Sequence, residues 1–585
     1  MTGGDRPPLK PRAKGTAMKT ISRHHKQGPF HLTRRGLLQA AGAAGILAGS
    51  APFVRAQDGS GAPLLRIGAG QAASWVRNFN PLVPDSLFPT QYAIHEPMLV
   101  FSTATGKTTP WLATGWGFSD DGKRLTFTLR DGVKWSDGQP FTARDVAFTL
   151  NLLKKNPGLS GSGGIRGVMD TMTGAAATDD HTCTVDFSRA FTPALYAIGQ
   201  QSIVPEHVWK DVADPVTFAN DNPVGTGPFT QVTVFKPQYW ELHRNPNYWQ
   251  AGKPGIEGLA FPSYASNDAG TLGLINGDFE WMQLFIPDVA NTFVARNPDH
   301  FRYWYPLIGE MVMLYANTAK KPLDDIVLRK AIGMGVNRQQ ICTVAVYDYT
   351  RPADATGMSD LYAQWKDPGV VEAGKDLVSH DPAKANAMLD AAGYARDGDV
   401  RKAPDGTPLE FELVMPSGWS DWVQAGQIIA QNLKEIGIRV KLRGVEVTAW
   451  YDATYKGAFQ LSLGSTSINP TPYDHFQSLM SGKVSRPVGE VAAVNWHRYG
   501  SPKIDGLLET FAATADEAQQ KGLAREMQQA FLDEWPAIPL YPGPQWGECS
   551  TAKFKGFPSA DAPYALLGPS IASEALLVLT ALTPA

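Results

Sequence analysis

The stretch Trp111–Lys155 reads WLATGWGFSDDGKRLTFTLRDGVKWSDGQPFTARDVAFTLNLLKK. Its centre, residues 125–129, alternates apolar and polar side chains, which is the period of a half-buried β-strand. The pairs Asp131-Gly132 and Asp137-Gly138 then bracket a further short strand. This part of the chain is therefore predicted to form antiparallel hairpins.

The hairpins lead into a helix. Thr142 followed by Asp145 is typical of a capping box, and apolar residues recur at helical spacing as far as Lys155. The next segment, residues 156–167, is rich in Gly and Ser and is expected to be an exposed loop.

Working outward, the second half of the chain has a different pattern. Residues 409–413 alternate as a strand, residues 422–436 have helical spacing, and residues 438–442 alternate again. A strand, a helix and a strand in this order form a βαβ unit, which implies a parallel sheet covered by helices. Another helix is delimited by Asp381 at its start and Gly393 past its end. The fold class is α/β, in several lobes.

Length and charge limit the possible functions. With 585 residues the chain is too long for one core, so two or three lobes are expected. The net charge of -3 is uneven, because residues 1–56 hold ten Lys and Arg and one acidic residue. The remaining 43 basic and 55 acidic residues give about -12, which argues against nucleic-acid binding.

The basic start of the chain is interpreted as an export signal. Residues 33–38 (TRRGLL) form a twin-arginine pattern, an apolar run follows to Gly49, and Val54-Arg55-Ala56 fits a signal-peptidase site. Residues 1–56 are thus predicted to be a twin-arginine signal peptide, and the mature protein to be periplasmic. A basic tail before a buried helix is the alternative. No cysteine lies near the cleavage site, so no lipid anchor is expected. No later segment is apolar for long enough to span a bilayer.

The sequence contains only weak matches to motifs for metal binding, cofactor binding or catalysis. The three cysteines, Cys183, Cys342 and Cys549, allow one disulfide at most, and their wide spacing fits no metal site. Gly68–Ala73 loosely imitates a dinucleotide fingerprint, but Pro81 and Pro84 interrupt the helix that should follow. No nucleophile, base and orienting residue can be named together. We therefore expect no cofactor, no metal and no enzymatic activity.

Trp111–Lys155 closely resembles the defining stretch of the peptide/nickel-type extracellular solute-binding proteins, solute-binding family 5. Further blocks resemble the same family in the same order: Asn222–Phe229 (NPVGTGPF), Arg244–Trp249 (RNPNYW), Asn317-Thr318, Leu328–Ile341 (LRKAIGMGVNRQQI), Asp381–Tyr394 (DPAKANAMLDAAGY) and Trp535–Tyr541 (WPAIPLY). Most of these residues are turns, caps and core strands, so they indicate the scaffold more than the ligand.

The resemblance implies a type II periplasmic-binding-protein-like fold, a three-lobed hinged clamshell with mixed sheets. The expected parts are a first lobe of residues 57–97, 222–305 and 536–585, a small lobe of residues 98–221, and a large opposing lobe of residues 306–535. It also implies a monomer that closes over its ligand and delivers it to the permease of an ABC importer.

The resemblance leaves two main ligand classes open, with nickel a distant third because the sequence has no His cluster to hold it. Peptide binders of the family resemble one another in a Gly-Trp…Asp…Asp-Pro stretch, where a carboxylate meets the peptide amine. Here that stretch begins Gly464-Ser465, so Trp is replaced by Ser, and no carboxylate occurs before Asp474. Other members bind β-linked oligosaccharides, and residues 417–422 and 471–474 resemble theirs more closely.

Tryptophans among polar neighbours suit a neutral, hydroxyl-rich ligand, since ring faces stack while amides bind hydroxyls. About half of them are expected to fill lobe cores instead, Trp422 first. The candidate ligand-binding residues are Trp75, Asn80, Trp281, Trp419, Trp422, Asn469, Tyr473, Asp474, Trp496 and Trp546. A short peptide and an oligosaccharide remain equally supported. The alternatives from another class are a secreted hydrolase and a periplasmic chaperone.

Overall fold

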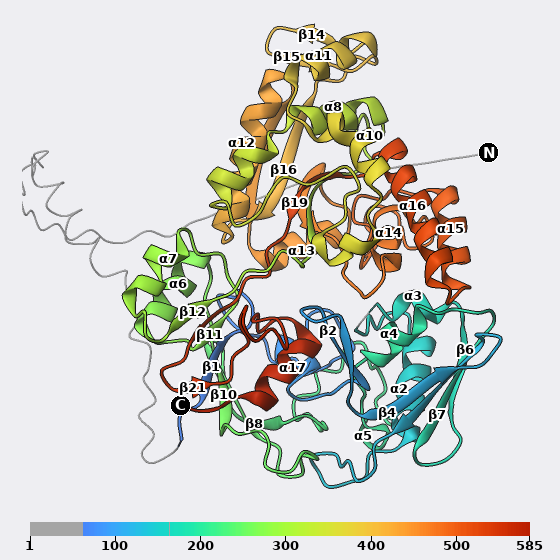
Figure 1. The fold of residues 1–585 in the computed structure, drawn as a ribbon, viewed down its shortest axis with the longest axis vertical. Helices are drawn as coiled ribbons and strands as arrows, with labels where there is room; N and C mark the ends of the chain where they lie inside the picture. The colour runs from blue at the N-terminus through green and yellow to red at the C-terminus, as the bar shows by residue number, and fades with distance from the viewer. Residues whose placement is uncertain (1–61, 163) are drawn as a thin grey trace, which may run out of the picture. The chain divides into compact units, whose positions relative to one another are not determined.

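A computed structural model describes residues 62–162 and 164–585. The predicted signal peptide lies outside the described residues. Three larger sheets organise the described chain, and we name three lobes after them: the first lobe holds a seven-stranded sheet, the small lobe a four-stranded sheet and the large lobe a five-stranded sheet (Figure 1). The exact lobe boundaries predicted above stay a prediction.

The first lobe is built from segments far apart in the chain. Its sheet has the order β12-β20-β11-β1-β10-β9-β8, with β1 parallel to both β10 and β11 and the other pairs antiparallel. The strands are β1 (Leu65–Gly68), β8 (Phe229–Lys236), β9 (Tyr239–Arg244), β10 (Gly258–Pro262), β11 (Trp281–Met282), β12 (Phe301–Tyr303) and β20 (Glu548–Ser550). The helices are η1 (Phe88–Gln91), α6 (Asn267–Asn276), α7 (Val289–Thr292), η2 (Val294–Arg296) and α17 (Ala572–Ala581).

The small lobe contains residues 111–155. Its antiparallel sheet has the order β4-β5-β7-β6, from β4 (Ala113–Phe118), β5 (Arg124–Leu129), β6 (Met172–Ala177) and β7 (Thr182–Phe187). Its helices are α2 (Ala143–Lys155), α3 (Arg166–Met169), α4 (Ala194–Gly199) and α5 (Glu206–Trp209). The two-stranded sheet of β2 (Leu99–Ser102) and β3 (Lys107–Pro110) lies beside them, whereas that of β21 (Phe554–Lys555) and β22 (Thr583–Pro584) lies beside the first-lobe sheet, near the C-terminus (Figure 1).

The predicted capping box is confirmed. The Thr142 hydroxyl accepts from Arg144 N at 3.3 Å, and an Asp145 carboxylate oxygen accepts from Thr142 N at 2.9 Å. These bonds satisfy amide groups that have no partner inside the helix. The predicted strand between the two Asp-Gly pairs is wrong, since only an isolated bridge joins Lys134 and Pro140 there.

The large lobe contains the predicted βαβ unit. Its sheet has the order β17-β16-β18-β13-β19, from β13 (Met311–Ala316), β16 (Glu410–Pro416), β17 (Arg439–Val445), β18 (Leu461–Ser465) and β19 (Ile538–Pro542). The long helix α12 (Ser420–Glu435) joins β16 to its parallel neighbour β17 as predicted, and Trp422 and Ile429 on its apolar stripe are buried. The predicted helix after Asp381 is α11 (Pro382–Ala391).

The remaining helices of the large lobe are α8 (Ile326–Gly335), α9 (Arg338–Gln340), η3 (Ile341–Ala345), η4 (Asp360–Trp365), α10 (Pro368–Val378), α13 (Val447–Tyr455), α14 (Tyr473–Met480), α15 (Pro502–Ala512) and α16 (Glu517–Glu534). The hairpin β14 (Ala395–Asp397) and β15 (Val400–Lys402) lies at the far end of this lobe (Figure 1). Within the described ranges, no helix is both apolar and long enough to cross a membrane. The three cysteines are buried free thiols.

Candidate functional site

Two chain segments cross side by side between the first and large lobes. One runs from β12 to β13 and the other from β19 to β20. They are joined by backbone hydrogen bonds from Trp304 N to Gly547 O at 3.0 Å, from Gln545 N to Pro306 O at 2.9 Å and from Gly543 N to Glu310 O at 2.7 Å. A pair of extended segments between two packed cores is the arrangement of a hinge. We call residues 304–310 and 543–547 the hinge.

The first and large lobes also touch away from the hinge. Asn267, at the start of α6, donates its backbone N–H to the carbonyl of Gly418 at 3.1 Å, and its side-chain amide lies 3.3 Å from the Ser420 hydroxyl. Gln71 of the first lobe donates to the Asn267 side-chain oxygen at 2.6 Å. We call Gln71, Asn267 and Gly418–Asp421 the interlobe contact.

A crevice of about 10 Å³ remains beside this contact, which is room for one water at most. It is lined by Gln71, Ala72 and Ala265 from the first lobe and by Pro416, Gly418, Glu446 and Val447 from the large lobe. The lobes are therefore closed on each other at this edge.

A carboxyl group lies under the interlobe contact. Asp421, in the first turn of α12, is buried and lies 3.4 Å from the Asn267 side-chain nitrogen. Burial raises the pKa of Asp421 to about 7, although backbone N–H groups and Asn267 favour its charged form.

Next to the interlobe contact, aromatic rings form a continuous cluster on the large lobe. Neighbouring ring centroids are 4.6–5.9 Å apart, in edge-on and tilted pairs. Its members, called the ring cluster below, are Tyr315, Trp419, Trp422, Trp450, Tyr451, Tyr455 and Trp496. The cluster brings together three predicted site residues, of which Trp419 and Trp496 are partly exposed and Trp422 is buried.

Four rings of this cluster were missed from the sequence. Tyr451 and Tyr455 are four residues apart on α13, and this spacing on one helix face was the available signal. The approach of Tyr315 and Trp496 depends on Gly464 in β18, where a Cβ would come within 2.6 Å of the Tyr315 ring and 3.0 Å of the Trp496 ring.

A second group of predicted residues lies between the small and large lobes. The Asn469 side-chain oxygen faces the Gln200 amide at 3.4 Å, and the Tyr473 ring packs edge-on against Phe191 at 5.8 Å. Asp474 accepts from Asn469 at 2.7 Å, and burial raises its pKa to about 6. These three side chains contact the small lobe or one another rather than the ring cluster.

The predicted exposed loop at residues 156–167 takes part in this contact, so that prediction is only partly right. Leu159 and Ile165 are buried, and Gly164 lies beside Asp474 and Asn469. The apolar side chains at these two positions pack into the small-lobe core. The Gly and Ser content of the segment gave no indication of this burial.

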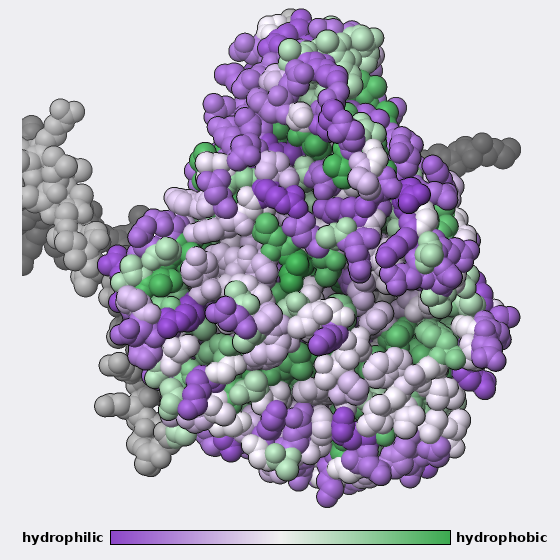
Figure 2. Space-filling view, in the orientation of Figure 1, coloured by the Kyte–Doolittle hydropathy of each residue, from purple (hydrophilic) through white to green (hydrophobic). Residues whose placement is uncertain are grey.

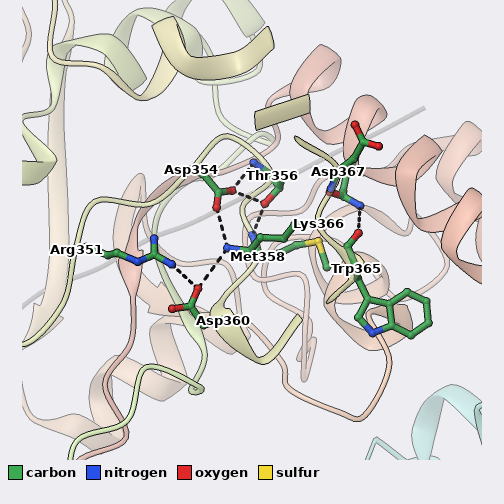
Figure 3. Close-up of polar contacts among 9 residues, drawn as sticks. Arg351, Asp354, Thr356, Met358, Asp360, Trp365, Lys366 and Asp367 are labelled. Carbon is green, nitrogen blue, oxygen red and sulfur yellow. Dashed lines mark hydrogen bonds and ion pairs between the residues drawn. The ribbon is translucent and has the colours of Figure 1, made fainter. Parts of the chain in front are cut away.

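Tyr362 in η4 fixes the backbone of Asn469 through two hydrogen bonds. The Tyr362 hydroxyl donates to the Asn469 carbonyl and accepts from the Asn469 N–H, both at 3.0 Å. The charged network that surrounds η4 is shown in Figure 3: the Lys366 ammonium lies 2.7 Å from Asp354 and 3.6 Å from Asp360, and Arg351 also pairs with Asp360. This network fixes the loop that carries Tyr362.

Three predicted residues have structural partners instead. Trp281 is fully buried in β11 and donates to the Leu567 carbonyl, and the Asn80 amide donates to two backbone carbonyls, Pro215 at 2.9 Å and Phe218 at 2.8 Å. Trp75 donates to the Phe261 carbonyl at 3.0 Å on the first lobe. Their polar atoms are already bonded within the protein, so the site proposed below omits them.

Trp546 lies in the hinge itself. Its partly exposed ring packs edge-on against Tyr305 at 4.8 Å and Phe285 at 5.5 Å. It therefore lies among aromatic rings at the first-lobe end of the hinge. Figure 2 shows apolar and weakly polar side chains gathered where the large lobe meets the other two, whereas the far end of the large lobe is mostly hydrophilic with a smaller apolar area.

No group of three or more His, Cys, Asp or Glu side chains in residues 62–162 and 164–585 is placed to hold a metal ion. The chemistry that the candidate site offers is ring faces, amides, hydroxyls and a few buried carboxyl groups.

Comparison with known proteins decides the family. The model described as "Bacterial extracellular solute-binding proteins, family 5 Middle" matches residues 107–486. The chain belongs to this family. Its members bind solutes outside the cytoplasm, and the chain is the solute-binding component of an ABC importer.

This family 5 protein is similar to curated relatives along most of its length. It is 28% identical over 486 residues to the nickel-binding periplasmic protein of Escherichia coli, covering 80% of this chain and 88% of that one. It is 27% identical over 446 residues to a glutathione-binding protein of Salmonella typhi, covering 73% and 79%.

Among solved structures, it is similar to the mannohexaose-bound periplasmic oligopeptide-binding protein of an oligopeptide ABC transporter from Thermotoga maritima. The TM-score is 0.81 with 25% identity, over 89% of this chain and 98% of that one. The predicted type II periplasmic-binding-protein fold is confirmed.

Proposed function

We propose that this protein binds a neutral, hydroxyl-rich oligosaccharide between its first and large lobes and delivers it chemically unchanged to the permease. The observation that carries the proposal is the ring cluster beside the interlobe contact. Tryptophan and tyrosine faces that stack on sugar rings, with polar groups at their edges, are the usual surface for such ligands. The similar Thermotoga maritima structure contains mannohexaose, which supports the same ligand class.

The polar edges of the ring cluster are available to a ligand. Trp419 and Tyr451 are partly exposed, and among the described residues their indole N–H and hydroxyl have no hydrogen-bond partner. The Tyr455 hydroxyl is likewise unpaired within the described chain. Such groups complete their hydrogen bonds with water in the open protein and with ligand hydroxyls in the closed one.

A short peptide is the second candidate. Asp474 and Glu310 are carboxyl groups near the lobe interfaces, and either could meet a peptide ammonium. Against this, Asp474 is already bonded to Asn469, and Ser465 stands where peptide binders of the family have a tryptophan. Similarity to a glutathione-binding protein supports this second candidate, so peptides are included in the binding test.

The proposal includes the export route and the state of the protein. We propose twin-arginine export to the periplasm without a lipid anchor, action as a monomer, and the three lobes with the boundaries given above. Neither a hydrolase nor a chaperone is favoured by any residue constellation in the described part of the chain.

Intrinsic tryptophan fluorescence tests the proposal. The mature protein is titrated with cellohexaose, mannohexaose and xylohexaose, and with tetrapeptides of varied sequence. A saturable change with a hexasaccharide, together with its unaltered mass after overnight incubation, is the expected result. Saturation with peptides alone would overturn the oligosaccharide assignment, and shortened products would identify a hydrolase.

A further inference from the structure

Glu310 is an acidic residue at the centre of the molecule that no motif singled out. It is the last residue of the hinge segment that precedes β13, and its carbonyl accepts from Gly543 N at 2.7 Å. Both crossing segments therefore fix its position. Its side chain is only partly exposed.

The carboxylate of Glu310 has no counter-charge. No Lys, Arg or His in the described ranges forms an ion pair with it, and its hydrogen-bonding neighbour is Ser465 at the end of β18. Burial raises the pKa of Glu310, and the bond from Ser465 only partly opposes that rise. A poorly solvated carboxylate without a cation is costly to keep, and such groups concentrate at functional sites.

Strand pairing places Glu310 beside the end of β18, because Met311 N donates to the Thr466 hydroxyl at 3.1 Å and Val312 pairs with Ser465. Burial raises the pKa values of Tyr315 and Tyr451, and the charge of Glu310 raises both further. Tyr315 already donates to the Ser465 carbonyl at 3.0 Å, whereas the Tyr451 hydroxyl is unpaired in the described structure. Glu310 and the Tyr315 hydroxyl thus share Ser465 as a neighbour, which puts an acceptor near the Tyr315 end of the ring cluster, beside the hinge.

We infer that Glu310 accepts hydrogen bonds from adjacent hydroxyl groups of one sugar unit whose ring face lies on the ring cluster. A carboxylate has two oxygens with the spacing to accept from two neighbouring hydroxyls, and hydrogen bonds to a charged acceptor are the strong ones. This inference rests on the proposed function and adds the residue that fixes the sugar unit nearest the hinge.

The test compares Glu310→Ala and Glu310→Gln with the wild type by titration calorimetry against the hexasaccharide that binds best. We expect Glu310→Ala to weaken binding at least tenfold and Glu310→Gln three- to tenfold, because the amide keeps one acceptor oxygen. Glu435→Gln is the matched control, an exposed carboxylate on the same lobe, with unchanged affinity. Thermal melting of each variant separates loss of binding from loss of folding.

A pH series distinguishes ligand binding by Glu310 from a purely structural role. A structural role alone would not make ligand affinity depend on the protonation of this carboxyl group. Wild-type affinity should fall as the pH is lowered through the raised pKa of Glu310, and Glu310→Gln should lack that part of the fall. Tyr315 and Tyr451 are the titratable groups on which the charge of Glu310 acts, and both stay neutral over this range because burial raises their pKa values.

The possible results distinguish failure of the role inferred for Glu310 from failure of the proposed function. Hexasaccharide binding of wild-type strength in both Glu310 variants would overturn this inference and leave the proposed function standing. Binding of a tetrapeptide alone, lost in Glu310→Gln and on acetylation of the peptide amine, would overturn both and show that Glu310 binds an ammonium group.

Discussion

The backbone N–H of Asn267 lies 3.1 Å from the carbonyl oxygen of Gly418, and this bond joins the first lobe to the large lobe. The two residues are adjacent to the starts of α6 and α12, respectively. The contact joins the two lobes at the edge where they are closed on each other. It is therefore the place to test whether closure and ligand binding are coupled.

Gly418→Ala should hold the lobes apart. A Cβ there would lie 2.6 Å from the Ala265 carbonyl oxygen and 2.8 Å from the Gln71 side-chain oxygen, both in the opposite lobe. We expect ligand affinity to fall at least tenfold while the melting temperature changes little. Small-angle scattering should show a larger radius of gyration with ligand than the wild type has.

The control for that variant is Gly522→Ala in α16, where a Cβ meets nothing within 4 Å. Alanine favours a helix by about 1 kcal/mol over glycine, so this variant should bind normally and melt slightly higher. A Gly418→Ala protein that closes and binds like the wild type would show that the contact does not limit closure.

Trp419→Ala should weaken ligand binding at least tenfold while the fold is kept. The ring is partly exposed at the edge of the ring cluster, so its loss removes stacking area without opening the buried core. Trp116→Ala, a partly exposed tryptophan on the small lobe, is the matched control. Equal affinity of the Trp419 variant and the wild type in calorimetry would remove this residue from the site.

Asp421→Asn should make stability less dependent on pH. Burial raises the pKa of Asp421 to about 7 from an ordinary 3.8, so the folded protein binds this proton more tightly than the unfolded chain does. Below about pH 4 the group is protonated in both states. As the pH rises from there to about 7, the unfolded chain loses the proton first and the free energy of unfolding falls.

The size of that effect is on the order of 2–4 kcal/mol. Tyr541 is the titratable group near Asp421, and it stays neutral because burial raises its pKa well above the ordinary value. Melting temperatures at pH 5 and pH 8 check the prediction: the variant should gain on the wild type at pH 8. The same difference at both pH values would contradict it.

Tyr362→Phe should destabilise the segment that carries Asn469. The change leaves the Asn469 N–H and carbonyl without their partner, at a cost of about 1–3 kcal/mol. Urea denaturation measures the loss. Tyr564→Phe removes one exposed hydroxyl bond, to the Gly556 carbonyl, and should cost less than about 1 kcal/mol. Similar midpoints for the two variants would show that Tyr362 does not support Asn469.

Much of the fold could be predicted from the sequence. The capping box of Thr142 and Asp145 and the apolar stripe of α12 are patterns among residues a few positions apart, and the structure confirms both. The prediction of a strand between the Asp-Gly pairs at 131–138 was wrong. The turn signals were present, but no partner strand lies alongside.

The candidate site was only partly predictable. Trp419 and Trp496 were named because they lie in predicted loops or at element ends among polar neighbours, and Trp281 was named on the same ground although it is fully buried. Whether a tryptophan faces solvent or a core depends on what packs on it from elsewhere in the chain. Glu310 was missed because one carboxylate in a strand-like segment carries no pattern.

The sequence by itself determined the family, the α/β class and the order of the main helices and strands, since caps, turns and periodicity act between neighbours. Only the tertiary structure decided which side chains meet at the lobe interface. Asn267 and Gly418, or Tyr315 and Ser465, are separated by more than a hundred positions, and their approach depends on how whole sheets pack. Packing joins such residues through surfaces rather than through spacing along the chain.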